Sequence, residues 1–325
     1  MSGNQVHEHF QNRTNVERYQ QRMDAAITPK WNVIEPYLEE IINRPDPVIV
    51  SIGAGSGALE AELVKRAQVK VIAFDVSLPM LSAIQNQSSQ LETDWQSAPS
   101  LPDRQPHLWA INADATQLPL GQTADAILGF SVFHEVATFA FDGDFGKMHE
   151  FFKNLLTKLK PGGLLCIRDF VQPEHPHNLV KIKLGTSPEF PPLDYLEFFL
   201  KNFKGMSLLN LRIQVAFLKS LGQWHPGAQL LLTRAQAMEL IAHYSWRSSP
   251  EEIRERYAFL PLEEYVSLIL EAGKSIGIEL KVEEATAEAQ PGYDQHTQGQ
   301  IDILKPDGER QPLPAWTGKI VIRRV

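Results

Sequence analysis

The chain has 325 residues, a formal net charge of −8 and 43% hydrophobic residues, which is typical of a globular protein of about two domains. Its one cysteine, Cys166, excludes an intrachain disulfide and a cysteine-rich zinc site. The acidic balance argues against a general nucleic-acid binder, because such proteins carry a basic stripe that faces phosphate. No secretory leader pattern and no apolar run of membrane-spanning length is found, so we expect a cytoplasmic protein without membrane association.

Apolar runs alternate with amphipathic segments over the first half of the chain. Helices are predicted within 1–45, and FGKMHEFFKNLLTKLK has apolar residues at helical spacing before a Pro-Gly-Gly stop. Repeated strand–helix units with short connections predict an α/β fold with a doubly wound, mostly parallel sheet. Its strands are expected at 47–53, 69–75, 108–114, 124–133 and 163–170.

The alternation stops after Asp169. Residues 171–260 hold proline-rich stretches and candidate helices without strand-like alternation, which predicts a helical insertion. The α/β pattern resumes with the helix LEEYVSLILEAG and the strand IGIELKVEEA, followed by a long polar loop and the closing strand GKIVIRRV. We therefore expect N-terminal helices at 1–45, a core domain formed by 46–170 and 261–325, and a helical lid at 171–260.

A glycine-rich loop follows the first predicted strand. Gly53-Ala54-Gly55-Ser56-Gly57 permits positive φ angles and close approach of a ligand, and the next helix offers free N–H groups. Asp75, 22 residues after Gly53, ends the second strand, where a carboxylate can accept both ribose hydroxyls of an adenosine cofactor. The loop also fits the GxGxxA pattern of a nicotinamide-binding unit, or a tight turn with a capping aspartate. We expect Asp75→Ala to weaken cofactor binding sharply with little unfolding.

The remaining motifs resemble those of the class I S-adenosylmethionine-dependent methyltransferases. VIVSIGAGSG resembles their first motif, VIAFDVSLPML the second, INADATQLPL with ADAILGFSVFHEV the next, and LKPGGLLCIRDF the last. The resemblance covers about 45–170 and 261–325. It implies a Rossmann-like sheet of seven strands with an antiparallel last strand, S-adenosyl-L-methionine as cofactor and S-adenosyl-L-homocysteine as product. A nicotinamide enzyme would instead continue with parallel strand–helix units.

The same resemblance implies a set of cofactor-binding residues. Family members commonly carry an acidic residue where this chain has Ser51, so a modestly weaker hold on the methionyl ammonium is expected. Tyr19 is expected either to close over the methionyl end or to pack as an ordinary helix residue. The other implied residues are Gly53, Ala54, Gly55 and Gly57 for the methionyl and ribose side, Asp75 for the ribose, Val76 and Met80 for the adenine face, Asp114 and Ala115 for the adenine edge, and Phe130 and Ser131 near the sulfonium.

Three side chains that follow the fourth and fifth strands are candidates for catalysis: His134, Glu135 and Asp169. Ligands of open α/β sheets bind at this carboxyl edge, and a neutral imidazole can take a proton from a hydroxyl or an amine. The alternative roles are structural: a hydrogen bond at the sheet edge, a helix cap or an ion pair with Arg168. The fourth strand ends in Phe-His-Glu, unlike the strand ends of metal-dependent family members, so no metal is expected.

The leading hypothesis is an enzyme that transfers a methyl group to an oxygen or nitrogen of a small-molecule acceptor by in-line displacement. The aromatic, slightly basic segment 171–260 would enclose the acceptor, pack as an ordinary core or form a homodimer. The chain lacks the (Asp/Asn)-Pro-Pro-(Tyr/Phe) and Pro-Cys sequences after the fourth strand, which disfavours methylation of adenine N6, a glutamine amide or cytosine C5. The alternatives are an RNA methyltransferase and a non-catalytic cofactor-binding protein.

Overall fold

The computed structural model describes residues 27–96, 107–247, 252–305 and 307–325, which form two compact units. The first, the sheet unit, runs up to Asp169 and includes Glu263–Thr286 and Gly318–Val325. The second, the insert unit, consists of Phe170–Leu262 and Ala287–Thr317. None of the described helices combines the length and the apolar character that a bilayer crossing needs.

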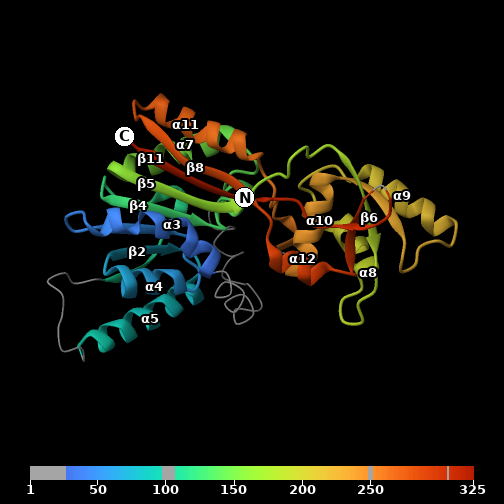
Figure 1. Cartoon of the computed structure of the whole chain (residues 1–325), viewed down its shortest axis with the longest axis horizontal. Helices are drawn as coiled ribbons and strands as arrows, with labels where there is room; N and C mark the ends of the chain where they lie inside the picture. The colour runs from blue at the N-terminus through green and yellow to red at the C-terminus, as the bar shows by residue number, and fades with distance from the viewer. Residues whose placement is uncertain (1–26, 97–106, 248–251, 306) are drawn as a thin grey trace. The chain divides into compact units, whose positions relative to one another are not determined.

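The sheet unit contains a seven-stranded sheet with the order β3-β2-β1-β4-β5-β11-β8 (Figure 1). The five strands nearest the N-terminus pair in parallel with their neighbours. The central strand β4 is buried along its whole length, as expected for a parallel strand that is covered on both faces. The strands are β1 (Val48–Ile52), β2 (Lys70–Asp75), β3 (Leu108–Asn112), β4 (Ala124–Phe130), β5 (Leu159–Phe170), β8 (Leu280–Glu288) and β11 (Thr317–Arg324).

The last strand, β11, runs antiparallel to β8. The backbone N–H of Val325 donates to the carbonyl of Glu279 at 2.9 Å, and Lys319 lies 2.9 Å from the carboxylate of Glu284. Residues later in β11 therefore face residues earlier in β8. With β11 placed between β5 and β8, the predicted fold class is confirmed: a doubly wound, Rossmann-like sheet of seven mostly parallel strands with an antiparallel last strand.

Helices cover both faces of this sheet. Figure 1 shows α3, α4 and α5 over one face, where their apolar side chains share one buried cluster with the strands. Helices α7 and α11 lie together over the other face, where the rings of Phe152 and Tyr265 are 5.8 Å apart. The helices are α3 (Ile27–Ile42), α4 (Ala58–Ala67), α5 (Leu78–Gln96), α6 (Phe133–Glu135), α7 (Phe145–Lys158) and α11 (Leu262–Ser275).

The insert unit contains a four-stranded sheet with the order β10-β9-β6-β7. Helices do form within 171–260, as predicted, but the expectation that this segment holds no strands is wrong, because β6 and β7 lie in it. Strand β6 pairs antiparallel with both β7 and β9. The segment 285–316, expected as a polar loop of the core, supplies a helix and two strands to this unit. The elements are β6 (Leu179–Leu184), α8 (Pro192–Asn202), α9 (Leu209–Ser220), β7 (Gln229–Thr233), α10 (Arg234–Trp246), α12 (Pro291–Thr297), β9 (Ile301–Leu304) and β10 (Arg310–Gln311).

Aromatic side chains form the core of the insert unit. Phe199 and Phe203 stack with their ring centroids 4.7 Å apart, and Tyr195 and Tyr244 meet edge to face at 5.4 Å. All four are buried in the same cluster as Trp316. Most of the aromatic residues that were candidates for lining an acceptor pocket thus pack the core of their own unit instead.

A glycine in β4 allows the chain to turn into α6. A Cβ on Gly129 would lie 2.3 Å from the ring of Phe133, which meets Phe151 and Phe152 edge to face at 5.6 Å. We expect Gly129→Ala to lower the free energy of unfolding by about 1–3 kcal/mol, because the ring cannot move without displacing its neighbours. Urea denaturation measures this. Gly121→Ala is the matched control, since nothing lies within 4 Å of that Cβ, and equal stability of the two variants would contradict the prediction.

Candidate active site

A solvent-open cleft of about 880 Å³ lies at the carboxyl ends of β1, β2 and β4, and we call it the edge cleft. Strand β1 pairs with β2 on one side and with β4 on the other. The strand order therefore reverses beside the cleft, which is where open α/β sheets bind their ligands. The cleft walls come from the glycine loop, the end of β2, the turn after β3 and the segment after β4.

The glycine loop requires glycine for both conformation and space. Gly53, Gly55 and Gly57 have φ angles of +61°, +59° and +76°. A Cβ on Gly53 would lie 2.5 Å from Val132, and one on Gly57 would lie 2.6 Å from Ile84. The bare loop is therefore held between the exit of β4 and helix α5, with its backbone at the floor of the edge cleft.

The carboxylate of Asp75 joins the end of β2 to the glycine loop. Its Oδ2 accepts from the N–H of Gly55 at 2.8 Å, and its Oδ1 accepts from the N–H of Ser77 at 2.8 Å. A carboxylate has about four acceptor sites, so Asp75 can accept from more donors than these two N–H groups. The residue is 9% exposed and is one of the few charged groups in the cleft wall.

Two further predicted residues lie in the cleft wall with defined local structure. Asp114 caps a short 3₁₀ turn, because its Oδ1 accepts from both the N–H and the hydroxyl of Thr116 at 2.8 Å. Ser131 has a φ of +59°, a left-handed conformation that is uncommon for a residue other than glycine. Its N–H donates to the carbonyl of Arg168 at 2.8 Å, so the turn after β4 is tied to β5.

His134 and Asp169 form a buried pair at the same edge of the sheet. Nδ1 of His134 lies 2.6 Å from Oδ1 of Asp169, and the backbone N–H of His134 donates to Oδ2 at 3.0 Å. The two residues are 5% and 2% exposed. An ionised carboxylate only accepts, so Nδ1 carries the ring proton, and the lone pair of the neutral ring lies on Nε2. Tyr265 stays protonated nearby, because burial and the charge of Asp169 raise its pKa well above 10.

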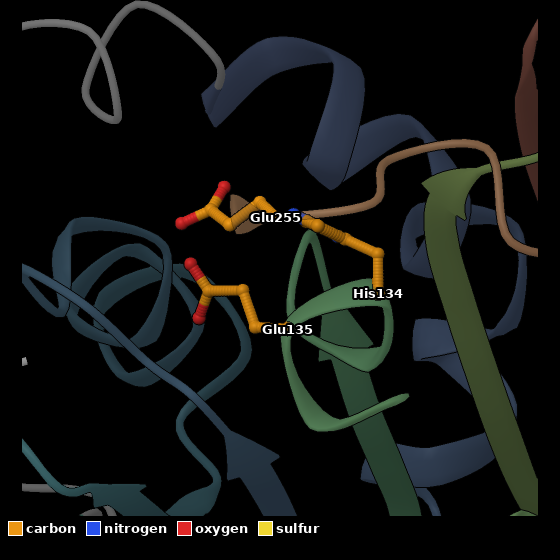
Figure 2. Close-up of side chains that lie close together, drawn as sticks. All are labelled: His134, Glu135 and Glu255. Atoms are coloured by element: carbon orange, nitrogen blue, oxygen red, sulfur yellow. The ribbon is translucent and has the colours of Figure 1, made fainter. Parts of the chain in front are cut away.

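Figure 2 shows His134 and Glu135 on the short green helix α6 that follows β4. Glu135 lines the edge cleft and is partly exposed. The other residue drawn in Figure 2, Glu255, belongs to the insert unit. The short helix therefore presents a carboxylate to the cleft and anchors the adjacent imidazole to β5.

A smaller pocket of about 330 Å³ lies on the side of the glycine loop that faces α3 and α4, and we call it the rear pocket. It shares Ile52 and Gly53 with the edge cleft. Two charged side chains line it, Lys30 from α3 and Glu60 from α4. The hydroxyl of Ser51 donates to Oε1 of Glu60 at 2.6 Å.

The predicted cofactor residues divide between the two cavities. Gly57 lines neither cavity, and Tyr19 lies outside the described residues. The edge cleft takes Gly53, Gly55, Asp75, Val76, Met80, Asp114, Ala115 and Ser131, and the rear pocket takes Ser51, Gly53, Ala54 and Phe130.

Sequence reasoning missed several lining residues. The apolar ones carry no signal that separates them from the core. Lys30 and Glu60 do carry a sequence signal, since each places a charge on the buried face of its helix. The missed residues are Ile52, Phe74, Ser77, Ala113, Val132, Val136 and Ala140 in the edge cleft, and Ile27, Lys30, Ser56, Ala58, Leu59 and Glu60 in the rear pocket.

The single cysteine, Cys166, lies in the middle of β5 and is fully buried. Burial raises its pKa to about 12, so almost no thiolate exists at neutral pH. We expect no reaction of the folded protein with Ellman's reagent at pH 8 and one thiol per chain after unfolding. Because the chain has no other cysteine, the count is unambiguous. Fast labelling of the folded protein would mean that β5 opens.

Comparison with known proteins identifies the sheet unit. Residues 50–167 match a family model described as a methyltransferase domain, and no curated protein matches the chain. The matched segment begins in β1 and ends in β5, so it contains the glycine loop, Asp75, Asp114 and the helix α6. Residues 50–167 therefore form a methyltransferase domain, which lies within the Rossmann-like sheet.

Solved structures resemble the chain at low sequence identity. An S-adenosylmethionine-dependent methyltransferase from Methanosarcina mazei is 14% identical, with a TM-score of 0.42 and coverage of 89% of this chain and 97% of that one. The YcgJ protein from Bacillus subtilis is 12% identical (TM-score 0.47; coverage 90% and 97%). A putative sarcosine dimethylglycine methyltransferase from Galdieria sulphuraria is 12% identical (TM-score 0.44; coverage 93% and 85%). These proteins differ too much from the chain for their activities to be transferred to it.

Proposed function

We propose that the chain transfers a methyl group from S-adenosylmethionine to a hydroxyl or amine of a small-molecule acceptor, and that His134 takes the acceptor's proton. The observation that carries this proposal is the buried His134–Asp169 pair, which fixes the ring proton on Nδ1 one residue away from the cleft-lining Glu135. The net charge of −8 favours a small molecule over RNA as the acceptor, because RNA binding depends on basic surface.

The edge cleft suits the adenosine part of the cofactor. In this proposal, Asp75 accepts from the ribose hydroxyls, and Asp114 and Ala115 meet the adenine edge. Val76 and Met80 pack on the adenine face. Ser131 lies toward the sulfonium, at the strained turn after β4. The support for this fit is the combination of two carboxylates and apolar walls in one cleft.

The residues have a limited chemical task, because bound S-adenosylmethionine supplies both the methyl group and a good leaving group. The glycine loop and the turn after β4 hold the reacting groups in line, an alignment that can contribute up to about 7–11 kcal/mol to the barrier reduction. His134 removes the proton of the acceptor through Nε2. The electron pair of the broken O–H or N–H bond stays on the acceptor atom, which forms the new bond to the methyl group. Asp169 keeps Nδ1 protonated and stabilises the imidazolium that forms. Water then takes the proton from His134.

Calorimetry with S-adenosylhomocysteine tests the cofactor part of this proposal, and we expect one site per chain. The acceptor part is tested by measuring S-adenosylhomocysteine release with a panel of small hydroxyl and amine compounds and, separately, with RNA. Turnover with small molecules that falls in His134→Ala supports the proposal. Turnover with RNA alone contradicts the acceptor class, and unchanged turnover in His134→Ala contradicts the base.

A further inference from the structure

The rear pocket contains a carboxylate with an unused acceptor atom. Glu60 is 3% exposed, and the hydroxyl of Ser51 bonds to its Oε1. Its Oε2 is fully buried and has no hydrogen-bond partner among the described residues. An unsatisfied buried polar atom is rare in folded proteins, and burial raises the pKa of this carboxyl because the charged form loses hydration. The group therefore has capacity for a donor that is not one of these residues.

A positive charge lines the same pocket. Lys30 is 6% exposed on α3, whose other buried residues are all apolar. Lysine is almost never buried to this extent unless it is paired. The charge of Lys30 lowers the pKa of Glu60, which opposes the effect of burial. One pocket of about 330 Å³ thus holds a buried acid and a buried base. That pair of charges is complementary to an amino-acid zwitterion, whose ammonium needs an acceptor and whose carboxylate needs a donor.

The position of the pocket connects it to the edge cleft. Both cavities are lined by Ile52 and Gly53, at the end of β1 where the glycine loop begins. A ligand with its ribose at Asp75 can therefore extend past Gly53 into the rear pocket.

We propose that Glu60 and Lys30 bind the amino-acid end of the cofactor, with Glu60 Oε2 accepting from the α-ammonium and Lys30 Nζ donating to the α-carboxylate. This inference rests on the proposed function. Glu60, oriented by the Ser51 hydroxyl, supplies the negative charge that position 51 itself lacks. We therefore no longer expect Ser51 to weaken binding of the methionyl ammonium. The pocket selects for a cofactor that carries both the adenosine and the amino acid.

The test uses three ligands that differ only at the amino-acid end: S-adenosylhomocysteine, its decarboxylated analogue and methylthioadenosine. Calorimetry compares the wild type with Glu60→Gln and Lys30→Met. We expect Glu60→Gln to weaken the first two ligands about 10- to 100-fold and methylthioadenosine less than about twofold. Lys30→Met should weaken only S-adenosylhomocysteine, because the other two ligands have no α-carboxylate.

Glu62→Gln is the matched control, since it makes the same change two residues along α4 at a more exposed ion pair with Arg66 (2.7 Å). It should leave all three affinities unchanged. Thermal unfolding of each variant sets the temperature at which all of them are folded, and the calorimetry is done at that temperature. An equal loss of S-adenosylhomocysteine and methylthioadenosine binding, or no loss in Glu60→Gln, would overturn this inference and leave the proposed function standing. Failure of the wild type to bind S-adenosylhomocysteine would overturn both.

Discussion

Asp169→Asn is expected to lower kcat about 10²- to 10⁴-fold, the range that general-base catalysis contributes. The reason is geometric. Asp169 accepts two bonds from His134, one from the ring and one from the backbone N–H. Asparagine has only one oxygen, and the backbone N–H cannot change its role, so the amide NH₂ faces Nδ1. The proton then moves to Nε2, and the ring loses its function as a base toward the acceptor.

Turnover is measured with the acceptor found in the panel, together with the affinity for S-adenosylhomocysteine. That affinity should stay within about twofold of the wild-type value, because neither residue is part of the edge-cleft lining. The double variant with His134→Ala should be no slower than the slower of the two single variants, since the two residues act as one unit. Additive losses, or wild-type turnover in Asp169→Asn, would show that the pair only supports the sheet edge.

Asp75→Ala is expected to weaken S-adenosylhomocysteine binding about 100-fold, because it removes the acceptor proposed for two ribose hydroxyls. The structure adds a second effect that the sequence did not indicate. The carboxylate also accepts from the N–H groups of Gly55 and Ser77, so its removal leaves two buried donors unsatisfied. We therefore expect stability to fall by about 1–3 kcal/mol rather than to stay nearly constant.

Calorimetry and urea denaturation separate these two effects. Asp75→Asn is the matched control: it keeps one acceptor oxygen and nearly the same volume, so both losses should be intermediate. The calorimetric comparison is made at a temperature where both variants are folded. Wild-type affinity in Asp75→Ala would mean that the ribose lies elsewhere and would remove the basis for placing adenosine in the edge cleft.

The sheet unit was predictable because its signals are local. Each strand from β1 to β5 is an apolar run, and β1, β2 and β4 are each followed by helices. The glycine loop and Asp75 stand at fixed places relative to those runs. The catalytic candidates were found by the same rule, as polar residues directly after β4 and β5. Their contact was not predictable, because His134 and Asp169 are 35 positions apart and only the pairing of β4 with β5 brings them together.

The sheet of the insert unit was missed for the opposite reason. Strand β6 does alternate between buried and more exposed side chains, with Val180 and Ile182 buried and Lys181 and Lys183 more exposed. This signal spans only six residues. Strand β7 is a short apolar run directly before a helix, so its pattern merges with that of α10. Ile182 pairs with Ile303, a partner that no local pattern can reveal.

The two units alternate along the chain, which limits where the protein can be truncated or its units separated. The insert unit is encoded in two blocks, 170–262 and 287–317, with a helix and a strand of the other unit between them. A truncated product that stops at residue 286 would leave β6 with one open side, and such an edge can recruit strands from other copies. Grafting the insert onto another methyltransferase scaffold would therefore require two coordinated splices rather than one.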